Sequence, residues 1–164
     1  MKMNYSWMME QALKEAEKGR DSGEVPVGAV LVDAKGIITA RAHNMPISLN
    51  DPTAHAEVMA LRSAAASFKN YRLTGMTLVV TIEPCLMCMG AAINARISRV
   101  VFGAYDPKSG AAGSLYNLGE DNRLNHQIEV ISGIMEEDCR NLIQDFFRYK
   151  RNGQKDHGEV PKWS

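Results

Sequence analysis

Two short segments of the chain carry residue types that can bind a metal ion and move a proton. A His-Ala-Glu triplet begins at His55 and ends at Glu57, and a Pro-Cys-x-x-Cys motif contains Cys85 and Cys88. Residues at positions i and i+3 share one face of a helix, so the two sulfurs can approach the same ion. Two thiolates and one imidazole suit zinc, and three protein ligands leave a fourth tetrahedral position open, which is typical of catalytic zinc sites.

Glu57 is the group that hydrolysis at such a site would need. Zinc lowers the pKa of a bound water from about 15.7 to about 7, and a neighbouring carboxylate can take up and return the proton. On a regular helix, however, the side chains of His55 and Glu57 would point about 200° apart. Both can face one centre only if His55 lies at the edge of the helix, so we predict that this helix begins near Ala54.

Each motif alone has another interpretation. A Cys-x-x-Cys pair that follows a strand is also found in thioredoxin-like redox proteins, and isolated His-x-Glu triplets arise often by chance. Both motifs lie at a predicted helix start within one small domain, and this combination favours zinc. The joint pattern is the signature of zinc-dependent nucleobase deaminases.

The composition restricts the class of protein. The chain has 164 residues, of which 45% are hydrophobic and 23% charged, as expected for one globular domain. Because 19 Lys and Arg residues balance 19 Asp and Glu residues, a basic patch for nucleic acid can only be local. Three cysteines do not form a disulfide framework, and neither a signal peptide nor a membrane-spanning run occurs. We therefore expect a cytoplasmic protein without a membrane anchor.

Strands that alternate with helices predict an α/β fold with a partly parallel sheet. The predicted strands are residues 25–32, 37–42, 77–82, 99–103 and 127–132, and the predicted helices are residues 6–18, 54–66, 85–95 and 136–151. Residues 103–119 hold four glycines and predict a long, functional loop. We expect a single domain over residues 1–152 and a flexible C-terminal tail over residues 153–164.

From about Ser6 to Arg151, the sequence resembles the cytidine and deoxycytidylate deaminase superfamily, and within it the tRNA adenosine deaminases. Besides the two motifs, the likeness rests on Asn44 and on EVPVGAV at 24–30, DPTAHAE at 51–57, NYRL at 70–73, GAAGS at 110–114 and DFFR at 145–148. The resemblance implies a three-layer α/β/α cytidine deaminase-like fold with a mixed five-stranded sheet. It also implies hydrolytic deamination of adenosine to inosine at the wobble position of tRNA anticodons, by a homodimer with one Zn²⁺ per subunit.

The same resemblance implies roles for individual residues. His55, Cys85 and Cys88 would hold zinc, and Glu57 would transfer the proton. The residues expected at the substrate are Asn44, the Ala56 backbone, Val27, Ile82 and Asp106 around the adenosine, and Phe146, Phe147, Arg148 and Lys150 beside neighbouring anticodon nucleotides. Adjacent helical positions point about 100° apart, so one of the two phenylalanines should face the core while the other is free to stack on a base.

Other functions stay open on the sequence alone. A free-base or nucleoside deaminase, such as a guanine or cytosine deaminase, would share the fold and the zinc motif. A non-catalytic RNA-binding subunit would keep zinc for stability, but it would have no use for Glu57. The glycine-rich segment 110–114 and the aromatic and basic segment 146–150 favour tRNA. The third cysteine, Cys139, lies on the apolar face of the last predicted helix, and we expect it to pack in the core.

Overall fold

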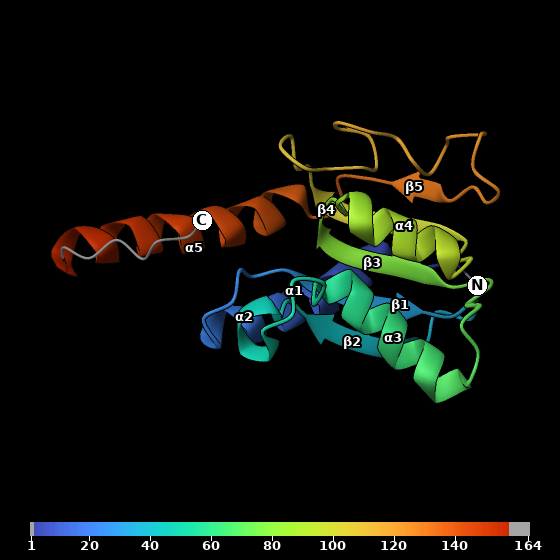
Figure 1. Ribbon diagram of the computed structural model, residues 1–164, viewed down its shortest axis with the longest axis horizontal. Helices are drawn as coiled ribbons and strands as arrows, with labels where there is room; N and C mark the ends of the chain where they lie inside the picture. Colours follow the sequence, from blue (N-terminus) through green and yellow to red (C-terminus); the bar gives the residue numbers. More distant parts are fainter. Residues whose placement is uncertain (1, 158–164) are drawn as a thin grey trace.

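The apolar segments of the sequence form one five-stranded sheet in the computed structural model, which describes residues 2–157 (Figure 1). The strands are β1 (Gly28–Val32), β2 (Ile38–His43), β3 (Thr77–Ile82), β4 (Arg99–Ala104) and β5 (Glu129–Ile131). They lie in the order β2-β1-β3-β4-β5. Strand β1 pairs antiparallel with β2 and β3, whereas β4 pairs parallel with β3 and β5. The predicted mixed five-stranded sheet is confirmed.

Helices cover both faces of this sheet and give three layers (Figure 1). Helices α1 (Tyr5–Asp21) and α5 (Glu136–His157) pack on one face, and α3 (Ala56–Phe68) and α4 (Leu86–Asn94) pack on the other. Strand β1 serves both cores, because its side chains alternate between faces: Ala29 and Leu31 contact one core, Val30 and Val32 the other. The predicted α/β/α architecture is confirmed. No helix within residues 2–157 is long and apolar enough to cross a bilayer.

Helix α1 lies very close to strand β1. Its first turn is capped by Asn4, whose side-chain oxygen accepts a hydrogen bond from the Trp7 N–H at 3.0 Å. Further along, a Cβ placed on Gly28 would collide with the backbone carbonyl of Ala12 in α1. Glycine at this position therefore allows α1 to pack closely against β1.

Substituting Gly28 with alanine should lower the free energy of unfolding by about 1–3 kcal/mol, because the added methyl group overpacks the contact with α1. The matched control is Gly153→Ala in α5, where nothing lies within 4 Å of the added Cβ. That substitution should leave stability unchanged or raise it slightly. Urea unfolding of both variants measures the difference, and an unchanged midpoint for Gly28→Ala would contradict the prediction.

Two helices differ from the sequence prediction. A short helix, α2 (Pro46–Leu49), lies between the strand predicted over residues 37–42 and the helix predicted over residues 54–66, where no element was predicted. Helix α5 continues to His157, although Gly153 predicts an end near Arg151. A single glycine costs a helix only about 1 kcal/mol, so it does not end the helix by itself. Residues 153–157 of the tail predicted over residues 153–164 are thus helical, and residues 158–164 lie outside the described part of the chain. The flexibility of the tail stays a prediction.

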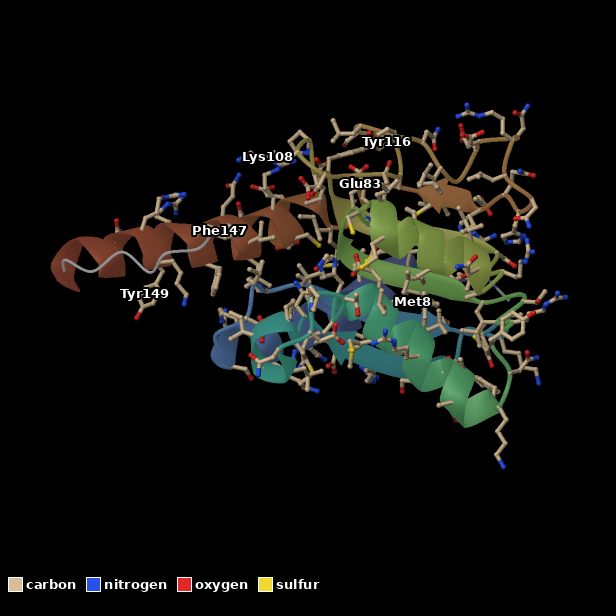
Figure 2. The ribbon with its side chains drawn as sticks, viewed as in Figure 1. Met8, Glu83, Lys108, Tyr116, Phe147 and Tyr149 are labelled. Carbon is tan, nitrogen blue, oxygen red and sulfur yellow. The ribbon has the colours of Figure 1, made fainter. Side chains whose placement is uncertain are left out.

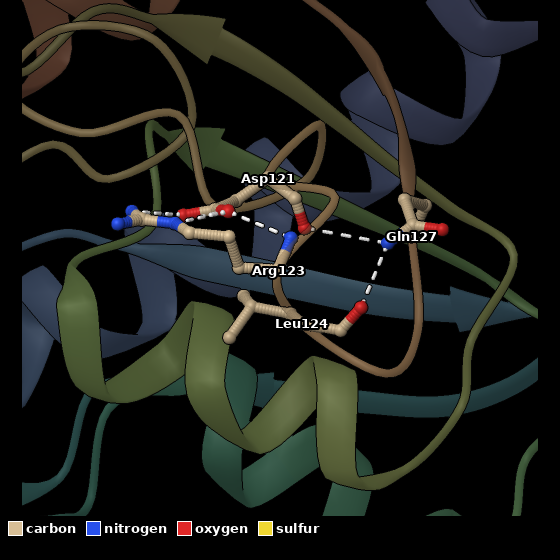
Figure 3. A network of polar contacts seen from close by, with 4 residues as sticks. All are labelled: Asp121, Arg123, Leu124 and Gln127. Carbon is tan, nitrogen blue, oxygen red and sulfur yellow. Dashed lines mark hydrogen bonds and ion pairs between the residues drawn. The ribbon is translucent and has the colours of Figure 1, made fainter.

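The long connection between β4 and β5 is ordered by polar contacts. Near its end, the Asp121 carboxylate accepts hydrogen bonds from the Arg123 guanidinium at 2.9 and 2.7 Å, and Gln127 donates to the carbonyls of Asp121 and Leu124 (Figure 3). The hydrogen bonds from Arg123 lower the pKa of Asp121 to about 2. The Leu124 side chain packs against the core that contains α3 and α4. These contacts hold the connection against the domain.

Candidate active site

The starts of two helices bring the three predicted metal ligands together. His55 is the N-cap of α3 and Cys85 is the N-cap of α4, and both have extended backbone angles. Cys88 lies in the first turn of α4 and is fully buried. The Nδ1 atom of His55 lies 3.6 Å from the Cys85 sulfur and 3.5 Å from the Cys88 sulfur. Because His55 precedes the helical turns, its ring and the Glu57 carboxylate can face the same space, as the prediction of a helix edge requires.

The spacing of these ligand atoms fits zinc. All three atoms lie within 4.8 Å of one another. A tetrahedral ion with Zn–N of about 2.1 Å and Zn–S of about 2.3 Å would place nitrogen and sulfur about 3.6 Å apart, close to the two separations above. One imidazole and two thiols therefore fit a zinc ion that keeps one position open.

The surroundings of the two thiols favour ionisation of one of them. Helices α3 and α4 both direct their N-terminal, positive ends at the ligand cluster, and neither N-cap side chain bonds to its own helix. The pKa of Cys85 falls to about 4, chiefly because the Cys88 thiol donates to it and also because His55 lies beside it. The same hydrogen bond, together with burial, raises the pKa of Cys88. Metal ligands must be deprotonated, so metal binding is coupled to the release of a proton from Cys88.

Glu57 combines deep burial with an unused oxygen. It lies in the first turn of α3 with 3% of its surface exposed, and its Oε2 atom has no hydrogen-bond partner within the described residues. Burial raises the pKa of this carboxyl by disfavouring its charged form. A carboxyl of this kind, facing a cavity beside metal ligands, is suited to exchanging protons with a bound molecule.

A cavity of about 650 Å³ reaches this centre and is lined by His55, Glu57 and Cys85. Its size lies within the range of small-molecule sites. The other lining residues are Val25, Val27, Asn44 and Ile82, then Glu83 and residues 104–109, and finally Arg140, Ile143, Gln144 and Phe147 from α5. The structure thus brings five of the predicted substrate residues to one cavity: Val27, Asn44, Ile82, Asp106 and Phe147.

The other predicted substrate residues lie elsewhere. Ala56 is buried, and its N–H donates to the Asn44 side-chain oxygen at 2.8 Å, so this group orients Asn44 and is not free for a base. Phe146 and Lys150 line a groove that α5 forms with the end of α1, and both also line a hollow that shares Val25 and Phe147 with the cavity. Arg148 pairs with Asp145 at 3.0 Å on the surface of α5.

The two phenylalanines of α5 face different surroundings, as their adjacent positions predict. Phe146 is 8% exposed, whereas Phe147 is 43% exposed and lines the cavity (Figure 2). Cys139, on the same helix, is buried as predicted, and burial raises its pKa to about 12.

One stripe of α5 lines the cavity, and of its four residues only Phe147 was predicted. Arg140, Ile143, Gln144 and Phe147 are spaced i, i+3, i+4 and i+7, so they share one face of the helix. That spacing was visible in the sequence, but its mixture of polar and apolar residues does not indicate which face meets the rest of the domain. The packing of α5 against β3 and β4 determines which face of the helix lines the cavity.

Comparison with known proteins identifies the family. Residues 2–104 match the cytidine and deoxycytidylate deaminase zinc-binding region. The chain belongs to the cytidine and deoxycytidylate deaminase family. Among its curated relatives, the tRNA-specific adenosine deaminase of Bacillus subtilis is 48% identical over 147 residues, which cover 90% of this chain and 91% of the relative. The tRNA-specific adenosine deaminase of Haemophilus influenzae is 48% identical over 148 residues, covering 90% and 86%.

Solved structures of this deaminase family share the fold. A structure from studies of A-to-I editing by tRNA:A34 deaminases at the wobble position has a TM-score of 0.80 and 42% identity, covering 84% of this chain and 99% of that one. The guanine deaminase of Bacillus subtilis has a TM-score of 0.61 and 30% identity, covering 99% of both chains. The zinc-binding character of the family agrees with the ligand cluster of His55, Cys85 and Cys88.

Proposed function

We propose that this chain deaminates adenosine to inosine at the wobble position of tRNA anticodons. The observation that carries the proposal is the meeting of the ligand cluster, the buried Glu57 and the α5 stripe at one cavity. The substrate is supported by relatives that are 48% identical and named tRNA-specific adenosine deaminases. The guanine deaminase of Bacillus subtilis is less similar in sequence, at 30% identity, which makes a free purine base the weaker alternative.

In the proposed reaction, water replaces the exocyclic amine of adenine and ammonia leaves. Bound zinc, held by His55, Cys85 and Cys88, would supply a Lewis acid that makes water nucleophilic at neutral pH. Glu57 takes one proton from this water and passes it to the adenine ring nitrogen. It then takes the second proton from the new hydroxyl group on C6 and gives it to the amine, which leaves as ammonia while the C6 carbonyl forms. Burial suits Glu57 to this role, because a carboxyl with a raised pKa both accepts and returns a proton readily near neutral pH.

Asn44 and its neighbours would orient the base. The Asn44 side-chain oxygen is occupied by the Ala56 N–H, which leaves the amide NH₂ group to donate to an acceptor on adenine. Val27 and Ile82 provide apolar walls. Asp106 is held by hydrogen bonds from the backbone of residues 108 and 109, and its carboxylate keeps acceptor capacity for a ribose hydroxyl.

A nucleotide in an anticodon loop can enter this cavity without first leaving a base pair, which lowers the cost of binding. A second groove, which shares Val25 and Phe147 with the cavity, offers contacts for the flanking nucleotides, because it combines the Phe146 and Phe147 rings with the cations of Lys150 and Arg151. Aromatic rings and cations in one groove are typical of single-stranded nucleic-acid sites.

Substituting Phe147 with alanine should weaken binding of an anticodon stem-loop about tenfold and leave stability unchanged, because a stacking ring is worth about 1–3 kcal/mol per base. The matched control is Phe146→Ala, which should lower the free energy of unfolding by up to about 3–5 kcal/mol because Phe146 is buried. Fluorescence anisotropy and urea unfolding measure the two effects. Binding of Phe147→Ala at wild-type strength would contradict the proposed contact.

We also propose that the enzyme acts as a homodimer in the cytoplasm. An apolar hollow on the outside of α3 and α4 is lined by Val58, Leu61, Tyr71 and Ala91, and a second copy would bury it. The three cysteines are unpaired, which agrees with a reducing compartment. Light scattering should report a dimer mass for the wild type and a monomer mass for Ala91→Glu, and a monomeric wild type would contradict the dimer.

The function is tested with an anticodon stem-loop that carries adenosine at the wobble position. We expect inosine at that position, read by sequencing, and no inosine when Glu57 is replaced by alanine. A stem-loop with adenosine moved one position along the loop serves as the matched RNA control. Free guanine, cytosine and adenosine are assayed in parallel. Ammonia from a free base, with no inosine in the RNA, would make the tRNA substrate wrong and leave zinc-dependent deamination standing.

A further inference from the structure

Glu83 is a buried carboxylate that has no part in metal ligation or proton transfer. It follows β3, lies two residues before Cys85 and is 2% exposed. Its Oε1 atom accepts hydrogen bonds from the Asp106 N–H at 3.1 Å and from the Ser114 hydroxyl. Its Oε2 atom accepts from the N–H groups of Ala112 at 3.1 Å and Ser114 at 3.0 Å. All four donors belong to the segment 106–114, which we call the pocket loop.

The pocket loop is also attached to the turn that carries the metal ligands. The Ala111 N–H donates to the Pro84 carbonyl at 2.8 Å, and Gly110 forms an isolated β-bridge with Cys85. A Cβ on Gly110 would collide with the Glu83 carboxyl group. The loop backbone therefore wraps closely around one carboxylate, which lies at the end of the sheet nearest α5 (Figure 2).

The start of this loop forms part of the cavity wall. Residues 106–109 line the cavity, together with the α5 stripe that includes Arg140 and Phe147. Because Glu83 accepts from the backbone N–H of Asp106, it fixes the backbone from which the Asp106 side chain extends. Hydrogen bonds to an ionised acceptor are about twice as strong as those between neutral groups, so four of them can hold an otherwise irregular segment in one conformation.

We propose that Glu83 is a positioning residue that fixes the pocket loop, so that Asp106 meets the substrate, while the metal ligands hold their geometry without it. The role of Asp106 rests on the proposed function above. The attachment of the loop does not, and it can be measured on the protein without RNA.

Glu83→Gln removes acceptor capacity at nearly constant size. If the amide nitrogen replaces Oε1, it faces the Asp106 N–H, donor against donor, whereas the Ser114 hydroxyl can turn to accept from it. In the opposite orientation the amide nitrogen faces two backbone N–H groups. The matched control is Asp121→Asn, because Asp121 also accepts a backbone N–H, from Arg123 at 3.0 Å, but lies outside the cavity.

Hydrogen exchange of the zinc-loaded protein gives the first measurement. Exchange of the amides in residues 106–114 should become at least about tenfold faster in Glu83→Gln and stay unchanged in Asp121→Asn, since lost hydrogen bonds allow local opening. Zinc content should remain one per chain in both. Unchanged exchange in the pocket loop would overturn the proposal. Loss of zinc from Glu83→Gln would show that the metal ligands need Glu83 to hold their geometry, which would also contradict it.

Kinetics on the stem-loop give the second measurement. The KM of Glu83→Gln should rise about tenfold, with a smaller change in kcat, because the bound nucleoside loses contacts made by the loop. Partial unfolding would instead lower the apparent kcat at constant KM, and that result would overturn the positioning role. Ser114→Ala should give a smaller rise in KM, and the double variant should fall short of additivity because the two side chains share a hydrogen bond. If the wild type forms no inosine, the exchange measurement still decides whether Glu83 holds the loop.

Discussion

Glu57→Gln is expected to lower kcat by about 10²–10⁴-fold while zinc content stays at one per chain. Glutamine has nearly the same shape as glutamate but cannot take up and return the proton that hydrolysis requires. The Glu57 carboxyl is 3% exposed and one of its oxygens has no partner within the described residues. A neutral amide is less costly to bury than a carboxylate, so the free energy of unfolding should not fall. Glu57→Gln should therefore lose activity without losing stability.

Single-turnover assays, zinc analysis and urea unfolding measure the three quantities. The matched control is Glu15→Gln, which alters another carboxylate that is only 5% exposed but lies in α1 and pairs with Lys18 at 2.8 Å. That variant should deaminate at the wild-type rate. If Glu57→Gln keeps more than about a tenth of the wild-type kcat, a different group transfers the proton and the assignment is wrong.

Cys88→Ala is expected to abolish zinc binding and, with it, activity. Cys88 is the most deeply buried of the three ligands, and its removal leaves only His55 and Cys85. An ion that binds only the folded state stabilises that state, so the melting temperature of the purified protein should also fall.

Cys139→Ala provides the matched control, because it removes the same kind of side chain from a buried position outside the ligand cluster. Cys139 packs against Gly103 on the opposite face of the sheet from α4, and burial raises its pKa to about 12, so it stays a neutral thiol. The variant should keep one zinc per chain and full activity, with a loss of about 1 kcal/mol in stability. Zinc analysis by mass spectrometry distinguishes the two variants. A Cys88→Ala protein that still holds stoichiometric zinc would show that other residues complete the site.

The metal ligands could be predicted from the sequence because their arrangement depends on short stretches of chain. Cys85 and Cys88 are brought together by the first turn of one helix, and His55 needs only the start of another. The strands could be predicted for a similar reason, since a strand that is buried on both faces is a short, continuous apolar run rich in β-branched residues. The boundaries were less predictable: Gly153 lies within α5 and Pro46 begins a short helix, because neighbouring contacts outweigh the preference of a single residue.

The sequence by itself determined the residue types of the zinc site, the order of strands and helices, and the two differing environments of Phe146 and Phe147. Only the tertiary structure decided which face of α5 meets the cavity, that the Ala56 N–H is used to orient Asn44, and that Glu83 holds a loop 23–31 residues further along the chain. The physical reason is the range of the interactions. Helical turns and strand alternation act over a few residues, whereas these contacts join segments that meet only after the sheet has assembled and the helices have packed on it.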